Sequence, residues 1–334
     1  QITYAGGVGG NDVVLTALAP MVVYVNDDWT TSGDLVDGDL ETAANEAATV
    51  GYDAFATIQE ALDALDTSAP SIVVINQGTY AETVTLPAHA VALQLVQGDS
   101  AITSLTGGAD DTLALGGFDG DHTVPHTLTL GDGSLASTLS GTGGLTKTGA
   151  GTLTLSGVNT YGGNTTIDGG TLQLSGGMNR LPVGTGVTLA DEAGARLDLN
   201  GNNQQIRWMA GGGTTGGLVT SSADADLTIN LLNSGSRVFS GAIDGALRVI
   251  VQNSTVKNTD AQTLAGTNGY TRGTLIDNGH LRIVTDGGLG AVPGALDAAN
   301  VTLQNGGVLQ NYNSDPVLDA NRGIRLDLGG GSFY

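Results

Sequence analysis

The stretch GGLTKTGAGTLTLSG, residues 143–157, raises the question of what fold this chain adopts. It sets Lys147 and Thr148 among glycines, as a phosphate-binding loop does, and then alternates Thr with Leu, as a β-strand does. A phosphate loop needs a glycine before the lysine and a helix after it, because amides at the helix N-terminus hold the anion. Here Thr146 precedes the lysine, and no helical pattern follows. The stretch therefore favours one coil of a repetitive β structure.

Comparable runs fill the chain after Pro70. Short segments of apolar residues and Thr are each closed by Gly, Asn or Asp, which supply the positive φ at which strands bend. A longer period is superimposed, because TLSGVNTYGGNTTIDGGTLQL at 154–174 aligns with TLAGTNGYTRGTLIDNGHLRI at 263–283. We therefore predict an all-β solenoid over 70–334. Its two related blocks lie at about 145–235 and 250–334.

The first part of the chain follows a different pattern. Residues 1–20 are predicted to form a pair of short strands around a Gly-Asn-Asp turn, either as a segment that ends a preceding module or as donor strands that complete the open end of a neighbouring copy. Residues 21–69 are predicted to hold a strand, an acidic loop and one amphipathic helix at 53–66, DAFATIQEALDALD, with Asp53 as its N-cap. Its apolar face would carry Phe55, Ile58, Leu62 and Leu65.

Two resemblances to known families extend this interpretation. GGLTKTGAGTLTLSGVNTYGGNTTIDGGTLQL at 143–174 resembles the passenger-associated repeat of bacterial autotransporters, and 263–283 resembles a diverged copy in which Arg272 replaces Gly163. The segment 24–86 looks like the start of pectin-lyase-like proteins. Both resemblances imply a right-handed parallel β-helix, and the second implies an amphipathic helix over its first coil. Coils of ~20–25 residues would give roughly 11–13 coils and a rod about 50–60 Å long.

The charge balance excludes several classes of partner. Eleven basic and 33 acidic residues give a net charge of −22, so neither nucleic acid nor an anionic membrane surface is an expected partner. Cysteine is absent, which excludes disulfides and thiolate metal sites. No apolar run of about 18 residues exists, so we expect no insertion of this segment into a membrane as a helix.

Candidate sites for chemistry are sparse. The acidic pairs in NDD at 26–28 and DD at 110–111 are interpreted as solvated turn carboxylates. The segment FDGDHTVPH at 118–126 gathers Asp and His residues, but Pro125 prevents the helix on which a His-x-x-x-His pair would bind metal. The segment GGVGGNDVVL at 6–15 only partly matches a calcium-binding nonapeptide. We therefore predict no catalytic, cofactor-binding or metal residues, and at most weakly bound calcium.

The sequence thus predicts a non-enzymatic, extracellular structural or adhesive rod. The resemblances imply secretion to a bacterial cell surface. Because the chain begins at Gln1 without Met, it is expected to be a processed chain or a fragment. Expected partners are a further copy bound head to tail, tandem modules, or a cell-surface or polysaccharide ligand. The alternative is a carbohydrate-active β-helix enzyme or sugar-binding module, for which Trp29 and Trp208 are the only tryptophan platforms.

Overall fold

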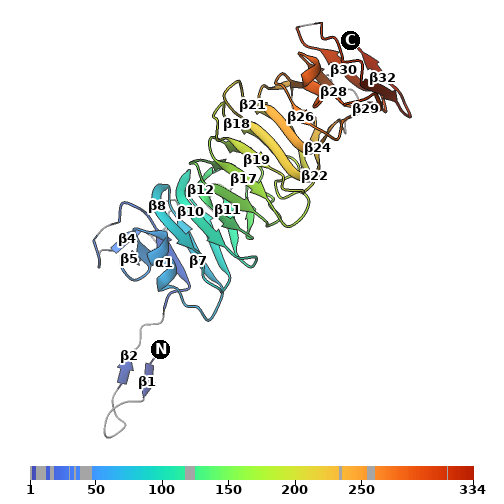
Figure 1. The fold of residues 1–334 in the computed structure, drawn as a ribbon. Helices are drawn as coiled ribbons and strands as arrows, with labels where there is room; N and C mark the ends of the chain where they lie inside the picture. Colours follow the sequence, from blue (N-terminus) through green and yellow to red (C-terminus); the bar gives the residue numbers. More distant parts are fainter. Residues whose placement is uncertain are drawn as a thin grey trace.

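The chain coils into a parallel β-solenoid of about 11 turns, stacked along one long axis (Figure 1). The structure is a computed structural model. It describes residues 2–4, 13–15, 19–29, 31–33, 35–37, 47–116, 125–232, 235–253, 260–313 and 315–334. At ~4.8 Å per coil, the solenoid is about 50 Å long. The all-β class, the parallel stacking and the coil number predicted from sequence are confirmed.

The strands lie on three faces of the coil, and all neighbours within a face are parallel. Face 1 comprises β3 (Val22–Val25), β7 (Ser71–Ile75), β9 (Val91–Leu95), β11 (Thr112–Leu115), β13 (Thr138–Ser140), β20 (Gln204–Ile206), β27 (Thr274–Asp277), β29 (Asp297–Gln304) and β31 (Arg322–Leu326). Face 2 comprises β14 (Leu145–Lys147), β16 (Thr165–Ile167), β18 (Gly186–Leu189), β21 (Trp208–Gly211), β23 (Arg237–Phe239), β25 (Gln262–Leu264), β28 (His280–Ile283), β30 (Gly307–Asn311) and β32 (Gly331–Phe333). Face 3 comprises β15 (Thr152–Leu155), β17 (Thr171–Leu174), β19 (Arg196–Asp198) and β26 (Gly269–Tyr270).

Longer strands bend across a corner and belong to two faces. They are β8 (Gly78–Thr85), β10 (Ser100–Gly107) and β12 (Leu128–Leu135), which join faces 2 and 3, and β22 (Leu218–Asn230) and β24 (Ala242–Gln252), which join faces 3 and 1. Strand β12, for example, pairs with β14 through its first half and with β15 through its second. The remaining elements are the antiparallel pairs β1 (Ile2–Tyr4) with β2 (Val13–Leu15) and β4 (Leu35–Asp37) with β5 (Ala47–Thr49), then β6 (Ala54–Phe55), α1 (Ile58–Ala64) and the 3-10 turn η1 (Asp286–Leu289).

The register of the coils explains the short-period sequence pattern. On face 2, Leu145 faces Thr165, which in turn faces Val187. Alternate residues point inward, so Leu172 and Leu174 of β17 are buried while the residues between them are partly exposed. Stacking these inward positions produces one continuous apolar core from Val23 to Leu309. Such a core grows with the number of coils, and it therefore needs few aromatic side chains.

The predicted helix is present but shorter than expected. It begins after Thr57, whose Oγ1 accepts a hydrogen bond from Glu60 N at 3.3 Å, so the assignment of Asp53 as N-cap is wrong. Asp53 instead accepts from Thr49 N at 2.5 Å and closes a turn. The next two residues are therefore extended and pair with β3 as β6.

Helix α1 packs against strands β3, β6, β7 and β8 at the end of the solenoid nearer the N-terminus (Figure 1). Ile58 and Leu62 are buried in the main core. The carboxylate of Glu82 on β8 accepts hydrogen bonds from Ile58 N at 2.7 Å and from Gln59 N at 3.0 Å. A negative charge at a helix N-terminus is favourable, so this contact fixes α1 to the first coils as a cap. Within the described residues, no helix is long and apolar enough to cross a membrane.

Candidate functional site

Lys147, the residue that suggested a phosphate loop, lies inside the solenoid with its side chain fully buried. Its Nζ donates hydrogen bonds to the carbonyl oxygens of Thr148 at 2.5 Å, Gly149 at 3.2 Å and Gly169 at 3.0 Å. Burial lowers the pKa of Lys147, while the nearby carboxylate of Asp132 acts to raise it. The ammonium group is thus bound by carbonyls of two successive coils, and it serves the fold rather than an anion.

Gly170 shows why glycines surround this lysine. Its backbone has φ +63°, and a Cβ there would lie 2.4 Å from the carbonyl oxygens of Gly149 and Gly151 and 2.6 Å from Lys147 Nζ. Any larger residue would displace the carbonyls that bind the ammonium group. The glycine-rich pattern of the opening stretch is therefore set by contact between coils.

The asparagine that both copies of the repeat share connects three coils. Asn159 Oδ1 accepts from Leu139 N at 2.9 Å, and its Nδ2 donates to Arg180 O at 2.7 Å. Asn268 repeats the arrangement, with Ile243 N at 2.9 Å and Gly288 O at 3.1 Å. Each amide satisfies one backbone group of the coil before it and one of the coil after it, where strand pairing is interrupted.

The shared tyrosine is equally internal. Tyr161 and Tyr270 are buried, and their hydroxyls hydrogen-bond Thr165 Oγ1 at 2.6 Å and Thr274 Oγ1 at 2.7 Å. Burial raises the pKa of both tyrosines, and hydrogen bonds from the threonines offset part of the rise. The residues that define the repeat therefore form an interior polar ladder and not a surface site.

Two further buried polar groups have no counterpart in the sequence prediction. Gln262 Oε1 accepts from Met209 N, and its Nε2 donates to Met209 O, both at 3.0 Å, so this side chain joins β25 to β21, two coils away and on the far side of β23. Arg322 is buried and binds Asp286 through two bonds of 2.7 and 3.0 Å, and Asn300 Oδ1 at 2.6 Å. In the sequence, the one sign of such a group is a polar residue at a position where the strand alternation predicts an inward, apolar side chain.

Asp286 illustrates how this buried ion pair is balanced. Burial alone would raise the pKa of Asp286, but hydrogen bonds from Arg322 and from Asp319 N outweigh it and hold the pKa below its ordinary value. Arg322 Nη1 and Nη2 also donate to Leu289 O at 2.9 Å and Gly290 O at 3.0 Å. The guanidinium group thus joins η1 to β29 and β31, the face 1 strands that follow it.

The acidic pairs singled out in the sequence do not form a catalytic pair. Asp27 accepts from Thr79 N at 3.0 Å, in the loop after β3. Asp111 is 2% exposed and accepts from Val91 N at 2.9 Å and Gly108 N at 2.7 Å, so its interpretation as a solvated turn carboxylate is wrong. It binds the backbone of an adjacent coil, whereas Asp110 is exposed.

The two metal hypotheses fall largely outside the described residues. In FDGDHTVPH, the side chains of Asp119, Asp121 and His122 lie outside them, and His126 is buried. In GGVGGNDVVL, residues 6–12 lie outside them. Across the part of the chain that the structure describes, no three His, Asp or Glu side chains gather in a way that could hold a metal ion.

The two tryptophans lie in different surroundings. Trp29 lines a surface hollow of about 650 Å³ beside α1, together with Glu60 and Asp63 but with no arginine among its lining residues. Trp208 on β21 lies 4.9 Å from the guanidinium carbon of Arg237, a cation–π contact. The groove expected of a polysaccharide-cleaving enzyme would combine carboxylates, arginine and aromatic platforms, and neither tryptophan lies in such a combination.

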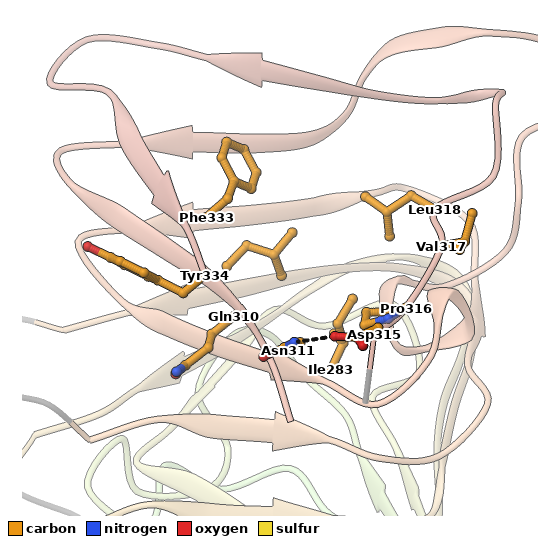
Figure 2. Close-up of a pocket in the computed structure, with 10 residues that line it drawn as sticks. Ile283, Gln310, Asn311, Asp315, Pro316, Val317, Leu318, Phe333 and Tyr334 are labelled. Carbon is orange, nitrogen blue, oxygen red and sulfur yellow. Dashed lines mark hydrogen bonds between the residues drawn. The ribbon is translucent and has the colours of Figure 1, made fainter. Parts of the chain in front are cut away.

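A second hollow, of about 450 Å³, lies at the opposite end of the solenoid, beside β28, β30 and β32. Figure 2 shows Phe333 and Leu318 on opposite sides of this hollow, with Val317 beside Leu318. Asn311 Nδ2 donates to Asp315 Oδ1 at 3.4 Å at its edge. Phe333 and Val317 are 48% and 88% exposed, so this end presents apolar surface to solvent.

Comparison with known proteins agrees with the repeat found in the sequence. Residues 145–174 and 256–283 match the Passenger-associated-transport-repeat family. The chain is similar to the adhesin BmaC autotransporter of Brucella suis biovar 1 (strain 1330), with 36% identity over 197 residues. That alignment covers 58% of this chain and 5% of the relative, so the chain spans a small part of that protein. No solved structure matches significantly. These matches and the solenoid fit a passenger-associated β-helix.

The interior asparagines provide a first prediction. Asn159→Ala leaves the amide of Leu139 and the carbonyl of Arg180 buried and unpaired, so we expect it to lower the free energy of unfolding by about 2 kcal/mol or more. Asn268→Ala should have a similar effect, and the double variant should be additive because the sites share no partners. Urea denaturation measures all three. A loss below about 0.5 kcal/mol in both single variants would contradict the ladder.

The buried tyrosines predict a loss of stability in alkali. Burial raises the pKa of Tyr80, Tyr161 and Tyr270, and for Tyr80 nearby carboxylates add to the rise. Their contribution to stability is fully present below the ordinary pKa of about 10 and is lost as pH rises toward the folded-state values. Phenolate absorbance should show these tyrosines ionising only as circular dichroism reports unfolding. In the double variant Tyr161→Phe/Tyr270→Phe, the loss of stability at alkaline pH should be smaller. An unchanged loss of stability would contradict this explanation.

Proposed function

We propose that this chain is a non-enzymatic segment of a surface-exposed, secreted bacterial autotransporter adhesin, in which it forms a stiff solenoid that carries adhesive surfaces. The observation that supports this most strongly is where the repeat residues lie. Lys147, Asn159 and Asn268 bind neighbouring coils inside the solenoid, and the buried Tyr161 and Tyr270 bond threonines four residues further along the chain. Because the residues that define the repeat serve to hold the coils together, the repeat is suited to a structural role.

Stiffness follows from the contacts between coils. Successive coils are joined by backbone hydrogen bonds along most of the three faces, and Asn159, Asn268 and Gln262 add side-chain links. A linear stack of this kind shares its stability among nearest-neighbour interfaces, so it resists bending along its whole length. The net charge of −22 keeps neighbouring rods apart in solution and supports a role in the extracellular space.

The non-enzymatic part of the proposal is supported by the absence of a gathered catalytic set among the described residues. The acidic side chains considered for catalysis bind backbone amides, as Asp27 and Asp111 do. The similarity to an adhesin points the same way. The expected partner at the end of the solenoid is a further coil, because the hollow beside β30 and β32 has an apolar lining that such a coil would cover.

Surface display tests the proposal directly. The chain would be fused to a secretion signal and an autotransporter translocation domain in a non-adherent bacterium, with the translocation domain alone as control. We expect protease-accessible display and several-fold more adherence to host-cell or matrix-coated surfaces. Display without any gain in adherence would contradict the adhesive role. The purified chain would also be incubated with a panel of polysaccharides. Formation of new chain ends, which would show cleavage, would contradict the non-enzymatic role.

A further inference from the structure

Three arginines line one surface hollow on face 1. Arg248 of β24, Arg272 before β27 and Arg325 of β31 come from different coils and border a volume of about 320 Å³. The other lining residues are Thr274, Leu275, Ala299, Thr302 and Gln304, so no carboxylate is among them. A pocket of this size matches a small ligand or one unit of a larger one.

This concentration of arginine stands out against the charge of the chain. The chain has 11 basic and 33 acidic residues, and its first lysine or arginine is Lys147. A random surface of such a protein would repel anions. Asp224, Asp226 and Asp327 balance the charge of the three arginines, so the hollow is a locally neutral place at which an anion can approach an otherwise acidic rod.

The arginines are held in position by acidic neighbours. Asp226 accepts from Arg248 Nε at 3.1 Å and from Arg248 Nη2, and it accepts from Arg272 Nη1 at 3.0 Å. Arg272 Nε also lies 3.3 Å from Asp224. Arg272 Nη1 also donates to Ala225 O at 3.0 Å. Among the described contacts, Arg248 Nη1 and Arg272 Nη2 make none of these bonds, which leaves both available to a ligand.

Arg325 completes the set on the next coils. It is 52% exposed along its side chain, and its Nη2 bonds Asp327 at 2.8 Å. In the register of face 1, Leu275 faces Thr302 and Thr302 faces Arg325. The base of the hollow is thus a straight outward row, with an apolar side chain, a hydroxyl and a guanidinium group on successive coils.

Arg272 also departs from the repeat, and its side chain links its own coil to the segment 224–226 of an earlier coil. It occupies the position of Gly163 in the first copy, where a Cβ would lie 2.5 Å from Gly143 O. In the second copy the backbone bond is kept, with Arg272 N donating to Leu247 O at 2.9 Å, while the side chain points to the hollow. The coil corner therefore accommodates an arginine that both links two coils and lines the hollow.

We propose that this hollow binds a sulfate ester of a polysaccharide. Three guanidinium groups match the three terminal oxygens of a sulfate ester better than the two of a carboxylate. A singly charged ester also suits arginines that are already balanced by Asp224, Asp226 and Asp327. Gln304 offers a polar group to sugar hydroxyls, and Leu275 offers an apolar contact to the ring. Thr302 is 7% exposed, and its hydroxyl donates to Ala299 O at 3.4 Å. The use of the hollow in adhesion rests on the proposed function, whereas the binding itself does not.

The test measures binding of the purified chain to heparin, to desulfated heparin that keeps its carboxylates, and to neutral dextran, by titration calorimetry. We expect binding to heparin alone. Arg325→Gln should weaken it about tenfold or more, because a charge-assisted hydrogen bond contributes about 1.5–3 kcal/mol. Arg272→Gln should weaken it as well. The matched control is Arg196→Gln on β19, which changes the same charge at an exposed position on face 3.

Each other outcome overturns the inference. Equal weakening by Arg196→Gln would show a general charge effect, and equal binding of desulfated heparin would show a carboxylate site. Competition by inorganic sulfate as effective as that by heparin would show a small-anion site, and poly-glutamate binding that Arg325→Gln removes would show an acidic-peptide site. Thermal unfolding of each variant confirms its fold. Surface display does not require these arginines, so failure here and failure of the proposed function are distinguishable.

Discussion

Hydrogen bonding from coil to coil is the constraint on which this structure depends. In a parallel solenoid each strand's amides and carbonyls are satisfied by the strands before and after it, so a single coil has no stability of its own. Regular strands satisfy this requirement on most of faces 1, 2 and 3. At the corners and interruptions the same requirement falls on side chains. Asn159 and Asn268 meet it by bonding backbone groups of neighbouring coils, and Gln262 meets it by bonding Met209 two coils away.

The same constraint explains the polar interior. A lysine and an arginine are costly to bury, yet Lys147 and Arg322 lie inside because carbonyls of adjacent turns, and for Arg322 also Asp286, accept their hydrogen bonds. It also explains the end of the solenoid, where α1 covers the core and Glu82 binds the helix N-terminus. The charged residues that suggest a functional site in the sequence thus serve to satisfy backbone hydrogen-bonding groups.

Sequence reasoning reached the fold because two periods are visible in it. Alternation of Leu with Thr predicted the strands, and the match of Tyr161 with Tyr270 predicted the two related blocks. It misplaced the helix start because the extended pair Ala54–Phe55 depends on pairing with β3, which no local pattern shows. It treated Asp111 as solvated because its partner amide, that of Val91, lies on another coil. The hollow lined by Arg248, Arg272 and Arg325 was not predicted for the same reason. These arginines are far apart in the sequence and come together only through the register of the coils.

The stacking of coils in this register is tested most directly by an engineered disulfide. Thr166 faces Thr188 across two coils of face 2, and the chain has no cysteine of its own to interfere. Facing residues ~4.8 Å apart lie within the Cα separation that a disulfide allows. Thr166→Cys/Thr188→Cys should oxidise readily to an intramolecular disulfide, whereas Thr166→Cys/Gln173→Cys, with its second cysteine on face 3, should not. Failure of the first pair to form, or equal formation by both, would contradict the solenoid.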